Sequence, residues 1–182
     1  MPTRDLIRTA LMVALCAAVG YLKVFVAPFA VLPNLELVSA AVFTCGVLSG
    51  ARRGALIGAL SAAIYFGLNP NGVSPPPLFV AQVLSMACMG GCGGGLRRLV
   101  RRLPWAMQSL LAGACGLVLT LVYDVATNSA GYLMVREASS YVAYLVAGLS
   151  FPFPLAHALG NTLGFALVTP AVCRAVWRRS TP

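Results

Sequence analysis

Long apolar stretches alternate with short segments rich in proline, glycine or arginine along the whole chain. The pattern predicts six apolar helices, at about residues 6–24, 35–51, 54–69, 78–96, 105–128 and 153–174. A helix that crosses a bilayer needs about 20 apolar residues, with a range of roughly 17–25. We therefore expect an all-α integral membrane protein with six transmembrane helices, folded as a single transmembrane domain over residues 1–182.

The connections between these helices differ in character. Residues 50–53 (GARR) are so few that the second and third helices should form a tight hairpin. Residues 25–34 are apolar but contain Pro28 and Pro33, which disfavour helix, so we expect this loop to lie over the protein. The apolar stretch from 141 to 151 is too short to span a membrane and predicts a short helix or re-entrant segment at the outer face.

The composition excludes a soluble protein. The chain is 59% hydrophobic and 9% charged, with a mean hydropathy of +0.86, whereas soluble domains are roughly 45–50% apolar and about 25% charged. A soluble protein of 182 residues has too small an interior to bury so much apolar surface. Four acidic residues and one histidine are also few for acid/base or metal chemistry, so the composition disfavours an enzyme.

The formal net charge of +9 indicates an orientation in the membrane and not a nucleic-acid partner. Eleven of the thirteen basic residues fall into four groups, separated by apolar stretches long enough to cross the membrane and return. These are Arg4 and Arg8; Arg52 and Arg53; Arg97, Arg98, Arg101 and Arg102; and Arg174, Arg178 and Arg179. By the positive-inside rule this side is the cytoplasm, which predicts a multi-pass cell-membrane protein with both termini cytoplasmic. Binding of nucleic acid would need a basic, water-exposed face, which this arrangement does not provide.

Several polar side chains gather at one level of the predicted helices, toward the outside. Asp124 lies in the fifth helix, where an unpaired ionisable group costs at least a few kcal/mol, and Asn128 shares its face. His157 and Asn161 repeat this spacing in the sixth helix. For Glu36, capping of the second helix and ligand binding both stay open; for the others the alternative is a satisfied core hydrogen bond. The candidate substrate-binding residues are Asn34, Glu36, Asn69, Asn71, Gln82, Tyr123, Asp124, Asn128, His157 and Asn161.

Small residues recur four positions apart on two helices. Ala10 and Ala14 share a face of the first helix, and Gly54 and Gly58 share a face of the third. In lipid such faces allow close backbone approach and mark helix contacts. Packing inside the protein and docking of another membrane subunit are both open for them.

Other motifs do not indicate catalysis, phosphate binding or metal binding. The glycine-rich stretch 89–95 lacks the Gly-Lys-Ser/Thr ending of a phosphate-binding loop. The six cysteines lie in or beside predicted helices, and Cys88 and Cys92 are interpreted as small packing residues. We expect no catalytic residues, no metal site, no cofactor and no ATP hydrolysis by this chain.

Nearly the whole chain resembles the substrate-binding S component of an energy-coupling factor (ECF) transporter. The resemblance rests on six short helices, on Ala10 and Ala14 just after a basic N-terminus, on proline-containing outer loops, and on residues 33–70 with their glycine/arginine hairpin. It implies capture of a vitamin or related micronutrient from outside. It also implies three partners: a transmembrane coupling protein and two cytoplasmic ATPases. Ala10 and Ala14 would then contact the coupling protein, together with Gly54 and Gly58, and the loop 25–34 would cover the ligand.

Two other classes of function stay open at this point. A non-transport scaffold subunit of a cell-envelope assembly would have no small-molecule ligand and would tolerate loss of Asp124 and Asn128. A membrane enzyme or self-sufficient carrier would turn over substrate without any ATPase. The sequence does not identify the ligand, since Glu36 and Asp124 suit amines, amides or cations, and the tyrosines suit a planar ring.

Overall fold

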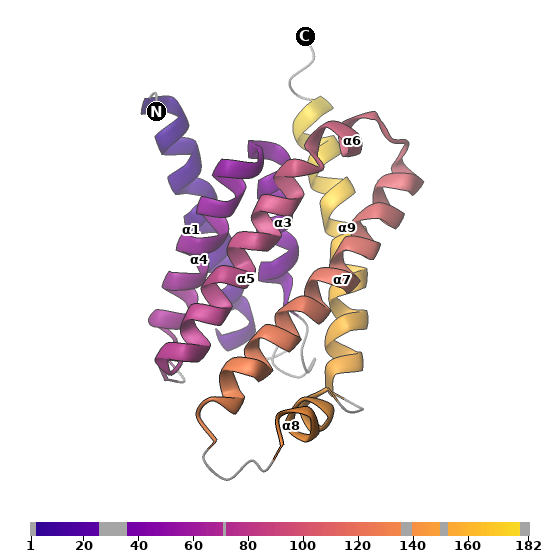
Figure 1. Ribbon diagram of the computed structural model, residues 1–182. Helices are drawn as coiled ribbons and strands as arrows, with labels where there is room; N and C mark the ends of the chain where they lie inside the picture. Colours follow the sequence, from indigo (N-terminus) through magenta and orange to yellow (C-terminus); the bar gives the residue numbers. More distant parts are fainter. Residues whose placement is uncertain (1–2, 26–35, 71, 136–139, 150–152, 179–182) are drawn as a thin grey trace.

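The computed structural model describes residues 3–25, 36–70, 72–135, 140–149 and 153–178 (Figure 1). Every regular element within these ranges is a helix. The helices are α1 (Thr3–Phe25), α3 (Leu37–Ser49), α4 (Ala51–Gly67), α5 (Pro76–Gly95), α6 (Arg97–Arg102), α7 (Trp105–Tyr132), α8 (Tyr141–Gly148) and α9 (Phe153–Arg178). The all-α fold class is therefore confirmed.

Six of these helices correspond to the six predicted apolar stretches. Four are long and apolar enough to cross a membrane: α1, α5, α7 and α9. The other two, α3 with 13 residues and α4 with 17, are shorter. Four such helices indicate a membrane protein, and the crossing of the membrane by α3 and α4 stays a prediction.

Glycine and proline set several of the helix ends. Gly50, at φ 92°, is the single residue between α3 and α4, which confirms the predicted hairpin. A positive φ is strained for residues with a Cβ, so glycine is the residue suited to this turn. Pro76 begins α5, where its missing N–H costs nothing. The predicted short outer helix is present as α8, whereas the predicted cover 25–34 falls almost wholly outside the described residues.

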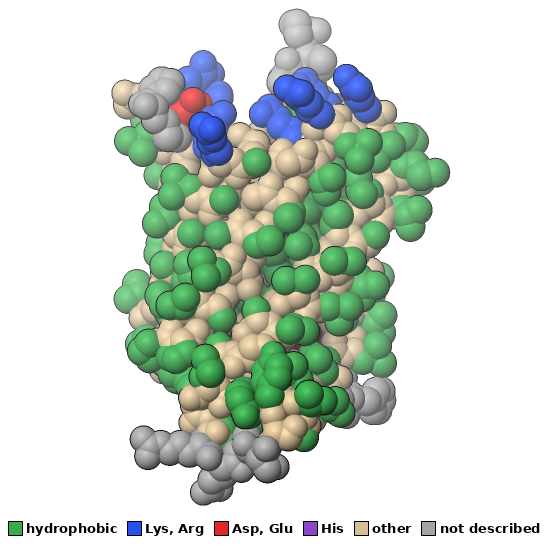
Figure 2. Space-filling view, in the orientation of Figure 1, with side chains coloured by type: hydrophobic (Ala, Val, Ile, Leu, Met, Phe, Trp, Pro, Cys, Tyr) green, Lys and Arg blue, Asp and Glu red, His purple; other side chains and the backbone are tan. Residues whose placement is uncertain are grey.

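The helices form a bundle with chemically different ends and flanks. The start of α1 and the end of α9 lie at the same end, at the top of Figure 1, and α8 lies at the opposite end. Arginine side chains gather at the first of these ends, which we call the arginine end, while the flank is covered by apolar side chains (Figure 2). Many of those apolar side chains are exposed, including Leu11, Leu110 and Leu163 at 64%, 68% and 62%.

Glycines bring the backbones of α3, α4 and α5 into direct contact. A Cβ on Gly54 would overlap the carbonyl oxygen of Gly90, and one on Gly58 would overlap that of Met86. A Cβ on Gly46 would also overlap the Gly90 carbonyl oxygen, so α3 joins the same contact. Gly54 and Gly58 are therefore buried inside the protein. Their assignment to a partner interface is corrected, because α5 already occupies the face that they form.

Ala10 and Ala14 have a different environment. Both lie on the exposed face of α1, while Val13 and Cys16 face the core. Their side of α1 is therefore open to contact with another molecule.

We expect Gly90→Ala to destabilise the protein, because the new methyl group meets backbone on α4 that has no rotamer to adjust. Overpacking of this kind costs about 1–3 kcal/mol, against a gain of about 1 kcal/mol in helix propensity. Gly91→Ala is the matched control, since its Cβ would lie 3.6 Å from the Cβ of Ala55, an ordinary contact. The measurement is the thermal unfolding midpoint in detergent. Equal midpoints for the two variants would contradict the glycine contact.

Candidate ligand-binding site

A histidine on α9 lies between two carboxylates from other helices. His157 Nδ1 is 2.8 Å from Asp124 Oδ1 on α7, and His157 Nε2 is 3.8 Å from Oε2 of Glu36, the residue before α3. Asp124 and His157 are buried, with 7% and 9% of their surface exposed. A protonated imidazole donates from both ring nitrogens, so this arrangement matches one cation held between two anions.

The start of α3 is oriented toward α9 by a backbone contact. The Glu36 backbone N–H donates to Asn161 Oδ1 at 3.2 Å, and Asn161 Nδ2 donates to Thr120 Oγ1 on α7 at 3.1 Å. Glu36 occupies the N-cap position of α3 but makes no side-chain capping hydrogen bond. The Glu36 carboxylate faces His157 instead of the backbone N–H groups of α3, and its place at the helix N-terminus also suits a negative charge.

Tyr123 and Gln82 complete this polar cluster. The Tyr123 ring stands edge-on to the His157 ring, with centroids 6.1 Å apart. Gln82 on α5 is buried and lies beside Tyr123. We call Glu36, Gln82, Tyr123, Asp124, His157 and Asn161 the buried polar cluster. Its members come from α5, α7, α9 and the residue before α3, as their common depth in the sequence predicted.

Four buried polar atoms of this cluster have no hydrogen-bond partner among the described residues. They are Glu36 Oε2, Gln82 Oε1, Asp124 Oδ2 and His157 Nε2. Buried polar atoms are hydrogen-bonded in most proteins, because an unmade bond costs about 1–3 kcal/mol. Glu36 Oε2 and His157 Nε2 face each other at 3.8 Å, beyond hydrogen-bond distance. Hydrogen-bond partners for the four atoms would come from water, from a ligand or from the rest of the chain. Three of the four are acceptors, so a molecule with several N–H or O–H donors would match them.

The remaining predicted site residues lie elsewhere or outside the description. Asn128 Nδ2 donates to the Asp124 backbone oxygen at 2.8 Å, a hydrogen bond within α7. Asn69 lies in the turn after α4, where its backbone oxygen accepts from the Gly72 N–H. Asn34 and Asn71 fall outside the described residues. Thr120 was missed, although it lies one helical turn before Asp124 on the same face of α7.

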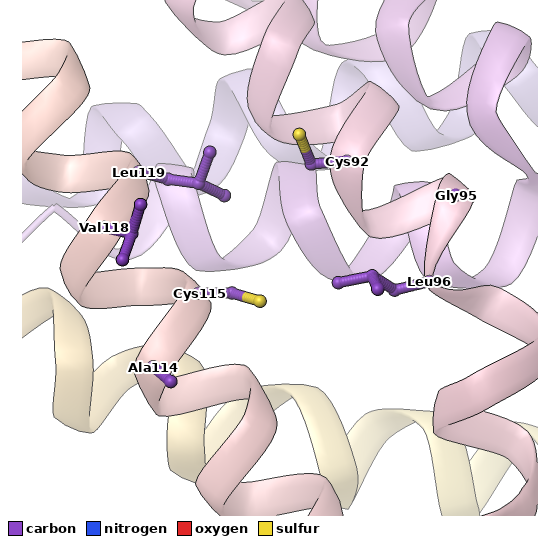
Figure 3. A pocket seen from close by; sticks show the side chains of 7 residues that line it. All are labelled: Cys92, Gly95, Leu96, Ala114, Cys115, Val118 and Leu119. Atoms are coloured by element: carbon purple, nitrogen blue, oxygen red, sulfur yellow. The ribbon is translucent and has the colours of Figure 1, made fainter.

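One hollow of the bundle flank lies apart from this cluster. An open groove of about 500 Å³ lies between α5 and α7, lined by Cys92, Gly95, Leu96, Ala114, Cys115, Val118 and Leu119 (Figure 3). Its lining is almost wholly apolar and suits a hydrocarbon chain better than a polar solute. In the described ranges no group of three or more His, Cys, Asp or Glu residues is placed to hold a metal ion.

Comparison of the chain with protein-family models, curated proteins and solved structures finds no match. The functional interpretation therefore rests on the residues themselves.

Removal of His157 should leave two buried carboxylates without their cation. Breaking a buried pair in this way costs about 3–5 kcal/mol, so His157→Ala should lower the free energy of unfolding strongly. The same substitution in a Glu36→Gln/Asp124→Asn background should cost much less, because no charge is left unpaired. Chemical unfolding of the native chain and the three variants in detergent measures both costs. Equal costs in the two backgrounds would show that His157 is not coupled to the carboxylates.

Proposed function

We propose that this protein is the substrate-binding S component of an ECF-type transporter. It binds a vitamin-like small molecule at the buried polar cluster and delivers it to partner subunits that hydrolyse ATP. The observation that supports this proposal best is the convergence of four buried polar atoms that make no hydrogen bond, from α5, α7, α9 and the residue before α3. Two of them, Glu36 Oε2 and His157 Nε2, lie 3.8 Å apart, and Gln82 Oε1 and Asp124 Oδ2 are the other two. A scaffold subunit has no need for such a costly group of buried atoms.

The proposed orientation places the arginine end in the cytoplasm and the buried polar cluster toward the outside, in agreement with the positive-inside rule. In this arrangement all six apolar helices cross the membrane, and both termini are cytoplasmic. Glu36 directly precedes α3 and His157 lies near the start of α9, at the ends of these helices remote from the arginines (Figure 1). A solute arriving from outside would reach the cluster first.

The chemistry of the cluster defines the class of ligand. Asp124 Oδ2 and Glu36 Oε2 are carboxylate acceptors, and the Gln82 amide oxygen is a third acceptor. A ligand with amine, amide or protonated heterocyclic nitrogens would satisfy all three. The edge-on Tyr123 and His157 rings add a surface against which a planar ring can pack.

A screen of vitamins against the detergent-purified protein tests the proposed binding. We expect at least one compound to raise the thermal unfolding midpoint of the native chain. Glu36→Gln and Asp124→Asn should each weaken its binding by roughly tenfold or more, the loss expected for one hydrogen bond to a charged group. Asp5→Asn is the matched control, because Asp5 pairs with Arg53 at the opposite end. Absence of any ligand, with full tolerance of Asp124→Ala and Asn128→Ala, would favour the scaffold.

A second experiment tests the proposed contact with the coupling protein. Ala10→Leu/Ala14→Leu places two bulky side chains on the exposed face of α1 and should reduce co-purification with the coupling protein several-fold. Ala171→Leu/Ala175→Leu is the control, since these alanines are also exposed and four residues apart, but on α9. Ligand-induced thermal shifts should be unchanged in both variants. Equal co-purification of both with the coupling protein would contradict an interface on α1.

A further inference from the structure

A second polar site lies at the arginine end of the bundle. A cavity of about 540 Å³ opens among α1, α3, α4, α6 and α9. Arg8, Arg53, Arg97 and Arg101 line it together with Asp5. In Figure 2 the basic side chains stand in two groups on either side of a notch at this end, one of them beside an acidic side chain.

The charges of this cavity do not balance. Asp5 Oδ1 is 2.9 Å from Arg53 Nη1, so its charge is already paired. Among the described lining residues Asp5 is the one carboxylate, which leaves three guanidinium groups in excess. Arg101 is held over the Trp177 ring at 5.8 Å, a contact that fixes its position but supplies no negative charge.

The positive-inside rule does not fully explain the position of these arginines. That rule accounts for the number of basic residues at one end, but it does not account for their convergence on one cavity. On α6, Arg97 and Arg101 are four residues apart and line the cavity, whereas Arg98 and Arg102 do not. Arg97 is half-buried, and the other three are exposed. Gathering like charges costs free energy unless an anion lies between them.

Thr9 and Ser49 add two hydroxyl groups to the lining, and the remaining wall is apolar and continues onto the flank of the bundle. Leu11, Met12 and Leu48 are part of the cavity wall, and Leu11 also belongs to the exposed apolar face of α1. A ligand that fits this site is therefore anionic at one end and apolar at the other. Phospholipids of the cytoplasmic leaflet have this chemistry, and basic pockets between membrane helices bind their head groups.

We propose that the arginine-end cavity binds the phosphate of an anionic phospholipid, with the acyl chains along Leu11 and the outer face of α1. The planar guanidinium groups of Arg97 and Arg101 donate paired hydrogen bonds to the phosphate oxygens. Arg8 supplies further positive charge from the α1 side. Arg53 stays paired with Asp5, which holds α4 against α1 at the mouth of the site. This site is independent of the buried polar cluster.

Titration of the full chain in detergent tests the proposal. The probes are dioctanoyl phosphatidylglycerol, dioctanoyl phosphatidylcholine and inorganic phosphate, and the readout is the thermal unfolding midpoint. Phosphatidylglycerol should raise the midpoint in a saturable way, and the two other probes should have little effect. Arg97→Gln/Arg101→Gln should weaken the apparent affinity for phosphatidylglycerol by roughly tenfold or more, since two charge-assisted contacts are lost. Arg98→Gln/Arg102→Gln carries the same change in net charge and should bind as the native chain does.

Other outcomes would overturn the proposal. Equal loss of phosphatidylglycerol binding in both double variants would mean that the lipid responds to the general surface potential. An equal shift with inorganic phosphate would indicate a site for a free anion, and an equal shift with phosphatidylcholine would indicate binding through the acyl chains. If phosphatidylglycerol does not raise the midpoint of the native chain in a saturable way, the cavity does not bind this lipid. Arg97→Lys/Arg101→Lys guards against misfolding, because it keeps the charge and should retain part of the affinity.

Discussion

The free-energy cost of placing a charge in apolar surroundings organises this structure. The flank of the bundle consists of exposed apolar side chains such as Leu110 and Leu163, and bilayer hydrocarbon offers no partner for an ionised group. Charged side chains are therefore confined to the helix ends or to an interior where they meet one another. The arginines occupy one helix end, and Asp124, His157 and Glu36 meet in the interior. Both candidate sites follow from this cost: one gathers charges at a helix end, and the other pairs charges in the interior.

The buried polar cluster also depends on how closely the helices approach. The glycine contacts of Gly54 and Gly90 fix α4 against α5, and Gly46 brings α3 into the same contact. α3 also contacts α9, where the hydroxyl groups of Thr44 on α3 and Thr169 on α9 form a hydrogen bond of 3.0 Å. This pair holds α3 and α9 together, so Glu36 at the start of α3 comes within reach of His157. A wider spacing of these helices would separate the carboxylates from the imidazole.

The hydrophobic pattern predicted the six apolar helices and the hairpin through residues 50–53, because the lengths of apolar runs and of the segments between them are local properties. The structure reduces that turn to Gly50 alone. The pattern also predicted that Asp124, His157 and Glu36 lie at one depth, since depth follows from position within each helix. The environment of small residues was not predictable in this way. Gly54 and Ala10 belong to equivalent patterns in the sequence, yet one is buried against α5 and the other is exposed. The convergence of Arg97 with Arg8 depends on how α6 lies relative to α1, which no single helix pattern contains.

The charge of the buried polar cluster sets a further condition on any ligand bound there. Two carboxylates and a protonated imidazole sum to −1, and with a neutral imidazole the sum is −2. A buried net charge is costly unless it is neutralised, so a ligand carrying one positive charge is favoured over a neutral analogue of the same shape. An anionic ligand would add to the negative charge and would also face the lone pairs of Glu36 Oε2 and Asp124 Oδ2, which make no hydrogen bond. The two proposed sites thus differ in electrostatics: guanidinium groups at the arginine end favour an anion, and carboxylates in the buried polar cluster favour a cation.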